Sequence, residues 1–168
     1  MSSPDSQWVS DFPIAFSTAP NVAASAKSNL CILDFASGNV AVIPGSDGLL
    51  VPHWSPDGRF IAAMTLDTMG MKLFNTSSGQ WTALNTGAVA FPEWSSDSRW
   101  IYYLKWTDSQ AVLRIRIADG KQESLADLKG VQYTGVYSSW MGLDPADAPM
   151  MLRDAGTDDV YSLTLQAQ

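Results

Sequence analysis

The sequence is poor in the residues that most often carry chemistry. It has one histidine, His53, and one cysteine, Cys31, among 168 residues. A single cysteine excludes an intrachain disulfide, and its place in the apolar run 30–33 indicates a buried, inert thiol. No apolar run is long enough to predict a transmembrane helix. The sequence also lacks a Gly-x-Ser-x-Gly elbow and a phosphate-binding glycine loop, so no catalytic motif stands out.

Basic residues are few as well. Ten Lys and Arg stand against 17 Asp and Glu, which gives a formal net charge of −7. Nucleic acids and anionic membrane surfaces bind to clustered Lys and Arg, so we expect neither as a partner. The first residues lack the basic and apolar regions of a signal peptide, and the chain as written is expected to stay in the cytoplasm.

What the sequence does contain is a repeat. Trp-Ser-Pro-Asp-Gly at 54–58 returns as Trp-Ser-Ser-Asp-Ser at 94–98, and we place a weaker third copy at Trp140. The first two copies each follow a short strand-like segment and precede a basic residue and an apolar run. A period of about 40–45 residues built from short strands is typical of a β-propeller blade.

We therefore predict an all-β fold in which residues 1–168 form a single partial β-propeller domain. It has about three and a half four-stranded antiparallel blades. The complete units cover 49–85 and 88–127. The incomplete units cover approximately 3–45, which lacks its inner strand, and 131–168, which lacks its outer strand. Open apolar faces in a repeat protein must be capped or paired. The sequence thus predicts closure by homo-oligomerisation, most simply as a dimer.

The stretch 52–59, Pro-His-Trp-Ser-Pro-Asp-Gly-Arg, resembles the TolB-like propeller repeat of bacterial proteins. The segments 152–157 and 160–163 look like the C-terminal blade of bacterial multidomain proteins. The resemblance covers nearly the whole chain, but the chain resembles only the last half of such a propeller. It implies roles in protein–protein interaction and sensing. It also implies relatives that are often periplasmic or membrane-anchored.

The residues that recur in both copies of the repeat suit a turn better than a catalytic site. An Asp in a tight turn accepts backbone N–H groups, and Gly supplies the positive φ that the turn needs. We assign this role to Asp57, Gly58 and Asp97 rather than that of a catalytic acid. Aromatic rings contribute large buried areas, so blade-to-blade packing is expected rather than ligand stacking. The tryptophans concerned are Trp54, Trp94 and Trp140.

One position of the repeat varies and is the candidate site. His53 precedes the Trp of the first copy, and Glu93 precedes that of the second. On an innermost strand they would lie near the central channel, and several copies converging on one axis could bind Zn²⁺. The alternative is that His53 only covers a packing surface. Ca²⁺ is a second candidate, from the acidic residues around Gly156, although their spacing favours a solvated turn.

These observations leave three functions open. The first is a non-catalytic binding module that presents its loops or channel to a protein or small molecule. The second is a metal-dependent hydrolase of a lactone, ester or phosphotriester, with its site in the channel of the oligomer. The third is a folded relic without a selected role. Both functional hypotheses rest on analogy between folds.

Overall fold

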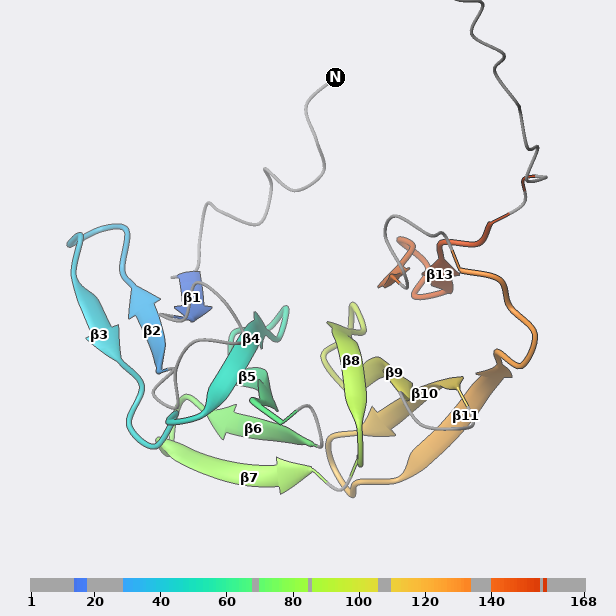
Figure 1. Ribbon diagram of the computed structural model, residues 1–168. Coiled ribbons are helices and arrows are strands. Elements are labelled where there is room, and N and C mark those ends of the chain that lie inside the picture. Colours follow the sequence, from blue (N-terminus) through green and yellow to red (C-terminus); the bar gives the residue numbers. More distant parts are fainter. Residues whose placement is uncertain are drawn as a thin grey trace, which may run out of the picture.

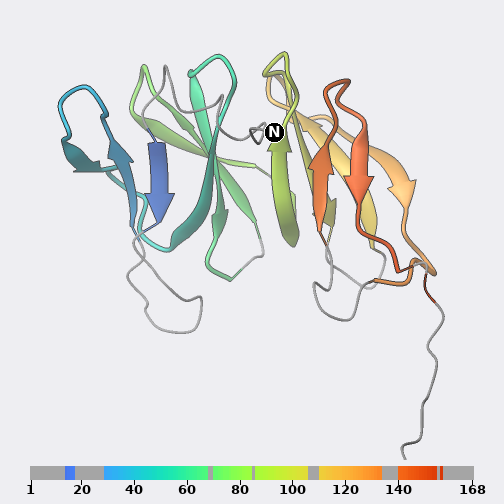
Figure 2. The ribbon, with the colours of Figure 1, turned by 90° about the horizontal axis from the view of Figure 1, so that it is seen from above.

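The computed structural model describes residues 14–17, 29–67, 70–84, 86–105, 110–133, 140–154 and 156. These residues form thirteen β-strands in four antiparallel sheets. No helix that could cross a membrane occurs among them. The sheets follow one another in chain order along an arc (Figures 1 and 2). The fold is therefore all-β, with the sheet arrangement of a partial propeller.

Two of the sheets have four strands each, and the two end sheets have fewer. The first sheet is β1 (Ile14–Ser17), β2 (Leu30–Leu33) and β3 (Val40–Val42). The second is β4 (Leu49–Trp54), β5 (Phe60–Thr65), β6 (Met71–Asn75) and β7 (Gln80–Leu84). The third is β8 (Val89–Trp94), β9 (Trp100–Lys105), β10 (Ala111–Arg116) and β11 (Gln122–Asp127). The fourth is β12 (Met141–Leu143) and β13 (Pro149–Met151).

In the second and third sheets, the first strand lies on the inner side of the arc and the last on the outer side (Figure 1). The predicted strand at 160–165 lies outside the described residues. Most of the expected inner strand at 133–141 also lies outside the described residues, and its last residue, Met141, begins β12.

The repeated motif forms the turn between the first two strands of a sheet. Ser55 N–H donates to the Phe60 carbonyl, and Gly58 N–H donates to the Ser55 carbonyl, each at 2.8 Å. The Asp57 carboxylate accepts from Ser55 Oγ at 2.7 Å and from Arg59 N–H at 3.0 Å. Gly58 has a φ of 72°, a conformation that costs glycine little. The Asp and Gly of the motif thus serve turn geometry.

The third copy of this turn corrects the repeat register that the sequence predicts. Asp144 N–H donates to the Ala148 carbonyl, and Asp147 N–H donates to the Asp144 carbonyl. Asp147 has a φ of 61°, which is positive like the 72° of Gly58 in the first copy. Leu143 therefore occupies the position of Trp54, three residues after Trp140. Trp140 is 41% exposed and lies beside Gly142 instead of filling the repeat position.

The inner strands of the two complete sheets share a bulge. Pro52 follows Val51, and the pairing of β4 with β5 is interrupted between Leu50 and His53. The pairing of β8 with β9 is interrupted at the same place, after Phe91. Val51 and Phe91 have φ values of 51° and 52°, which non-glycine residues seldom adopt. Proline has no N–H to donate to the neighbouring strand. The bulge places it where the two strands do not pair, so no hydrogen bond of the sheet is lost.

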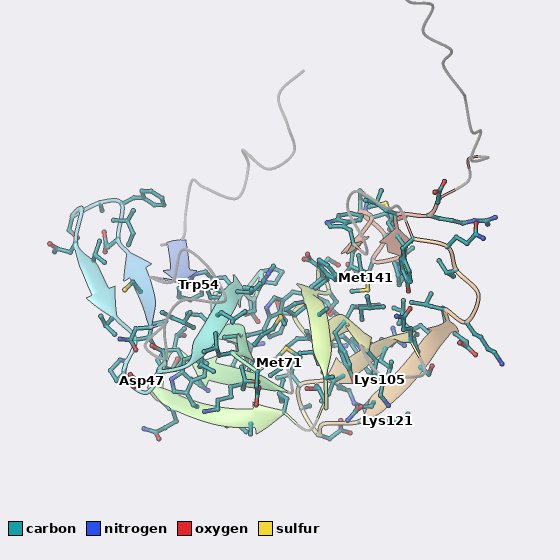
Figure 3. The ribbon with its side chains drawn as sticks, viewed as in Figure 1. Asp47, Trp54, Met71, Lys105, Lys121 and Met141 are labelled. Atoms are coloured by element: carbon teal, nitrogen blue, oxygen red, sulfur yellow. The ribbon has the colours of Figure 1, made fainter. Side chains whose placement is uncertain are left out.

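Each pair of neighbouring sheets buries its own apolar cluster. The cluster between the first and second sheets includes Leu30 and Ile61, both fully buried. The cluster between the second and third includes Met71 and Tyr103, and the cluster between the third and fourth includes Leu104 and Met141. Figure 3 labels Met71 and Met141 in two of these layers. Apolar burial between sheets is thus the main force that stacks them.

Candidate functional site

His53 and Glu93 occupy corresponding positions on the inner strands of neighbouring sheets. His53 lies on β4 opposite Ala62, and Glu93 lies on β8 opposite Tyr102. The corrected register places Gly142, opposite Met150, at this position in the fourth sheet. The third copy thus supplies no polar side chain there.

Burial governs the protonation of both side chains. It lowers the pKa of His53 and raises the pKa of Glu93, so the neutral form is favoured at each position. A divalent cation would favour the ionised carboxylate instead. No group of three or more His, Cys, Asp or Glu side chains able to hold a metal ion occurs in the described ranges. A metal bound by His53 and Glu93 stays a prediction that would need residues from further copies.

The turn carboxylates are held in place by their own loops. Hydrogen bonds from Ser95 Oγ and from the Arg99 N–H lower the pKa of Asp97. Partial burial opposes ionisation of Asp57, but the bonds from Ser55 and Arg59 outweigh it and lower the pKa. A carboxylate kept ionised and already saturated with donors is a poor general acid. This geometry favours the turn role over a catalytic one.

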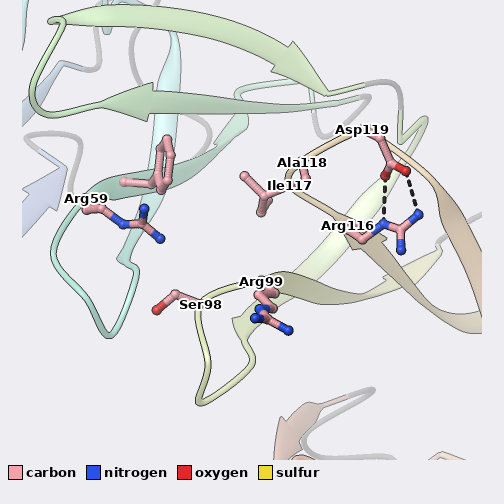
Figure 4. A pocket seen from close by; sticks show the side chains of 8 residues that line it. Arg59, Ser98, Arg99, Arg116, Ile117, Ala118 and Asp119 are labelled. Carbon is pink, nitrogen blue, oxygen red and sulfur yellow. Dashed lines mark hydrogen bonds and ion pairs between the residues drawn. The ribbon is translucent and has the colours of Figure 1, made fainter.

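A cleft of about 460 Å³ opens between the second and third sheets (Figure 4). Three of the chain's five arginines line it, at positions 59, 99 and 116. Arg59 pairs with Asp57 at 2.6 Å and Arg116 with Asp119 at 2.5 Å. The remaining lining residues are Phe60, Ser98, Ile117, Ala118 and Asp119. The nearby aspartates neutralise most of the positive charge. The sequence shows the repeated arginines at 59 and 99, but not that turns from separate repeats meet here.

The outward side of the first sheet exposes apolar residues. Leu30 and Ile32 pack toward the second sheet. Because successive residues of a strand point to opposite faces, Leu33 and its partner Val40 lie on the far face. Val42, opposite Cys31, shares that face, and Val40 and Val42 are 59% and 55% exposed. We call Val40, Val42 and the adjoining Phe35 the first end face.

The fourth sheet has a similar outward side. Met141, Leu143 and Met151 pack toward the third sheet. Met150 therefore points away from it, and Trp140 and Leu152 flank the same short sheet. These three exposed residues, Trp140, Met150 and Leu152, are called the last end face. The two end faces together contain six of the eight large hydrophobic side chains that are exposed among the described residues.

Two repeat tryptophans differ in one hydrogen bond. Trp94 Nε1 donates to the His53 carbonyl in the preceding sheet at 3.0 Å. Trp54 Nε1 is buried and has no hydrogen-bond partner among the described residues. Figure 3 labels Trp54 on the inner side of the arc, near β1. A buried N–H without an acceptor is costly, and the described residues supply none for Trp54.

No family model and no curated protein matches the sequence. Solved structures match its fold. TolB from Acinetobacter baumannii has a TM-score of 0.57 and 18% identity over 82% of this chain and 37% of its own. A putative TolB from Agrobacterium tumefaciens has a TM-score of 0.53 and 23% identity over 75% of this chain and 44% of its own. The tricorn protease has a TM-score of 0.57 and 16% identity over 82% of this chain and 14% of its own.

These likenesses define the class of the protein as an all-β partial propeller. The predicted TolB-like repeat is confirmed at the level of the fold. The chain spans less than half the length of either TolB chain.

Proposed function

We propose that this chain is a non-catalytic β-propeller interaction module that assembles with itself. In this proposal the last end face of one copy packs on the first end face of a second copy. A symmetric dimer contains two such contacts and closes the ring. Two copies of the four sheets give eight, at the upper end of the roughly 4–8 blades of known propellers.

The distribution of exposed apolar residues carries the proposal. Every sheet-to-sheet contact inside the chain brings one apolar face against another. The two end faces are the sides of the arc without such a cover in the described residues, and they hold most of the exposed large hydrophobic side chains. A surface of this kind marks an interaction site. A further copy of this chain offers the complementary face with the same strand geometry.

The net charge predicts how this assembly responds to salt. Two copies of charge −7 repel each other, and salt screens that repulsion while it strengthens apolar burial. Dimerisation should therefore become tighter as the ionic strength rises. The hydrolase alternative has less support, because the described residues hold no cluster of metal-ligating side chains and the likeness to known proteins concerns the fold alone.

Sedimentation equilibrium tests the assembly. The wild-type chain should reach twice its 18.2-kDa mass, and Val42→Lys or Met150→Glu should each return it to the monomer. Leu125→Lys is the matched control, because Leu125 is 41% exposed on β11 and belongs to neither end face. A wild-type chain that stays monomeric at all accessible concentrations overturns the proposal.

A mixing experiment tests the orientation of the contact. In a dimer of Val42→Lys with Met150→Glu, one contact pairs the new lysine with the new glutamate. The other contact keeps the native Val42 and Met150. Mixing the two monomeric variants should therefore restore a dimer. If like faces paired with like faces instead, each contact between the two different chains would place one charged substitution against an unchanged apolar face. No rescue would then occur.

A further inference from the structure

The indole N–H of Trp94 has a backbone acceptor in the neighbouring sheet. The acceptor is the carbonyl of His53, on the innermost strand of the sheet that precedes Trp94. Trp54 occupies the same place in the preceding unit, since Trp54 pairs with Ile61 as Trp94 pairs with Ile101. Its acceptor should therefore lie on an innermost strand of the first sheet.

The first sheet has no such strand among the described residues. Ile14 on β1 pairs with Leu33, as Ile61 on β5 pairs with Phe74. β1 is thus the counterpart of β5, and β5 has β4 on its inner side. The described part of the first sheet is ordered β1-β2-β3, so β1 is its inner edge. Among the described residues, nothing pairs with the inner edge of β1 and nothing accepts from the Trp54 N–H. One further strand at this edge could serve both.

We propose that the inner edge of β1 accepts an extended strand from a second copy of this chain. The strand would run antiparallel to β1, as β4 does to β5, and a backbone carbonyl of it would accept the hydrogen bond of Trp54 Nε1. Addition of a strand to a free sheet edge is a common mode of recognition between proteins. This inference rests on the proposed self-assembly and names the segment that completes it.

The local sequence is poorly suited to provide this strand. Five turn residues, Ser55–Arg59, separate β4 from β5. With the same turn before residue 13, the inner strand would fall on residues 2–7, Ser-Ser-Pro-Asp-Ser-Gln. None of these is apolar, whereas Leu49 and Val89, which begin β4 and β8, are each 1% exposed. An inner strand of this fold needs apolar side chains that 2–7 lacks.

The segment 160–165, Val-Tyr-Ser-Leu-Thr-Leu, has the required pattern. Tyr161, Leu163 and Leu165 alternate with smaller residues, as in a strand with one buried face. The segment follows β13, and the last end face around β13 is the surface that the proposed dimer places against β1–β3 of the second copy. The donated strand would therefore extend the proposed contact between the last end face of one copy and the first end face of the other.

The first test removes the indole donor and keeps an aromatic ring. Trp54→Phe in the full chain should weaken dimerisation by at least about tenfold, because an acceptor in the interface loses its donor. Trp81→Phe is the matched control, since Trp81 Nε1 donates to the Pro44 carbonyl of its own chain at 2.9 Å. In ¹⁵N-labelled wild-type protein, the Trp54 indole N–H should exchange slowly in the dimer and fast in the diluted monomer.

The outcomes separate this inference from the proposed function. A monomeric wild-type chain refutes both. A wild-type dimer that Trp54→Phe leaves unchanged, with a fast-exchanging Trp54 N–H, refutes the donated strand but leaves the end-face contact standing.

A pair of introduced cysteines tests which segment, and which copy of the chain, donates the strand. Chains with Cys31→Ser are given either Ala15→Cys on β1 or Leu163→Cys, and the two are mixed and oxidised. A disulfide between the two different chains is the expected product. Its absence refutes the assignment of 160–165. A disulfide that forms within one diluted chain carrying both substitutions refutes the second copy as the donor.

Discussion

Trp54 and Trp94 occupy equivalent positions in the repeat, but only the Trp94 indole N–H has an acceptor among the described residues. Trp94 is 8% exposed, lies 6.4 Å from Phe60 between ring centroids, and donates to the His53 carbonyl. Trp94→Phe removes the donor and leaves that carbonyl without its partner, at a cost of about 1–3 kcal/mol. Loss of part of the ring adds roughly 1–2 kcal/mol for the cavity. Trp54 is only half-buried, so its cavity term is no larger. Trp54→Phe also deletes an N–H that has no acceptor among the described residues.

The hydrogen bond and any difference between the two cavity terms therefore act in the same direction, toward a larger loss for Trp94→Phe. In the dilute monomer, Trp94→Phe should lower the free energy of unfolding by about 1–3 kcal/mol more than Trp54→Phe does. Urea unfolding followed by far-ultraviolet circular dichroism measures this. With a slope of about 2 kcal/mol per molar urea, a difference of about 2 kcal/mol separates the two midpoints by about 1 M.

The protein concentration decides what this experiment means. Above the dimer dissociation constant, the proposed strand would give Trp54 an acceptor and Trp54→Phe would become costly too. The measurement therefore belongs below that constant. Equal destabilisation by both variants in the monomer would refute the reasoning, because it would mean that Trp54 has an acceptor in its own chain or that this bond adds nothing.

Three further predictions concern charge and backbone strain. Burial raises the pKa of Glu93. Its contribution to stability is therefore present at acid pH and is lost as the pH rises through the pKa of the folded state. Glu93→Gln should raise the urea midpoint at pH 7 and leave it unchanged near pH 4. Arg116 and the Lys121 N–H lower the pKa of Asp119 to about 2. Its contribution to stability is therefore fully present above its ordinary pKa of 3.8 and is lost as the pH falls toward 2. Asp119→Asn should flatten the stability profile over that range. Val51 is held at a φ of 51°, and Val51→Asn should stabilise the chain by about 1 kcal/mol in thermal unfolding, since Asn tolerates this conformation better than a β-branched residue.

The sequence predicts the fold where the chemistry of the turn fixes the amino acids. The turn of the second sheet needs a carboxylate that accepts two N–H or O–H groups and a residue with positive φ, and Asp57 and Gly58 meet those needs. A repeat of the same letters therefore predicts the same turn. This is why the second and third sheets could be placed from the sequence.

The third repeat was misplaced because a different set of residues builds the same turn. The Asp144 carboxylate accepts from the N–H groups of Ala146 and Ala148, each at 2.8 Å. Asp147 adopts the positive φ, which Asp tolerates better than most residues. The hydrogen-bond pattern is kept while the amino acids differ. Trp140, the one tryptophan in this part of the sequence, therefore does not mark the position of the turn.

The candidate site could be predicted only in part. The inner-strand position of His53 and Glu93 follows from the repeat, but their burial depends on how neighbouring sheets pack. The arginine cleft joins turns of two repeats, and the end faces depend on which side of a strand points outward. Such features need the tertiary arrangement, and the unpaired N–H of Trp54 needs it at atomic detail.

The polar links between the turns of neighbouring sheets bear on the strand proposed at β1. In the third sheet, Ser98 takes the place of Gly58, and its Oγ accepts from the Asp57 N–H of the preceding turn at 3.1 Å. In the fourth sheet, Asp147 takes that place and its carboxylate accepts from the Ser96 N–H at 2.9 Å. In Ser98 and Asp147, the strain of a positive φ is offset by a bond that fastens the sheet to the one before it. Gly58 has no side chain for such a bond. Among the described residues, the first sheet is held by its apolar cluster with the second sheet, by the bond from Trp81 Nε1 to the Pro44 carbonyl, and by Ser46 Oγ, which accepts from the Leu30 N–H at 2.9 Å. A donated strand that pairs with β1 and Trp54 would add a further link.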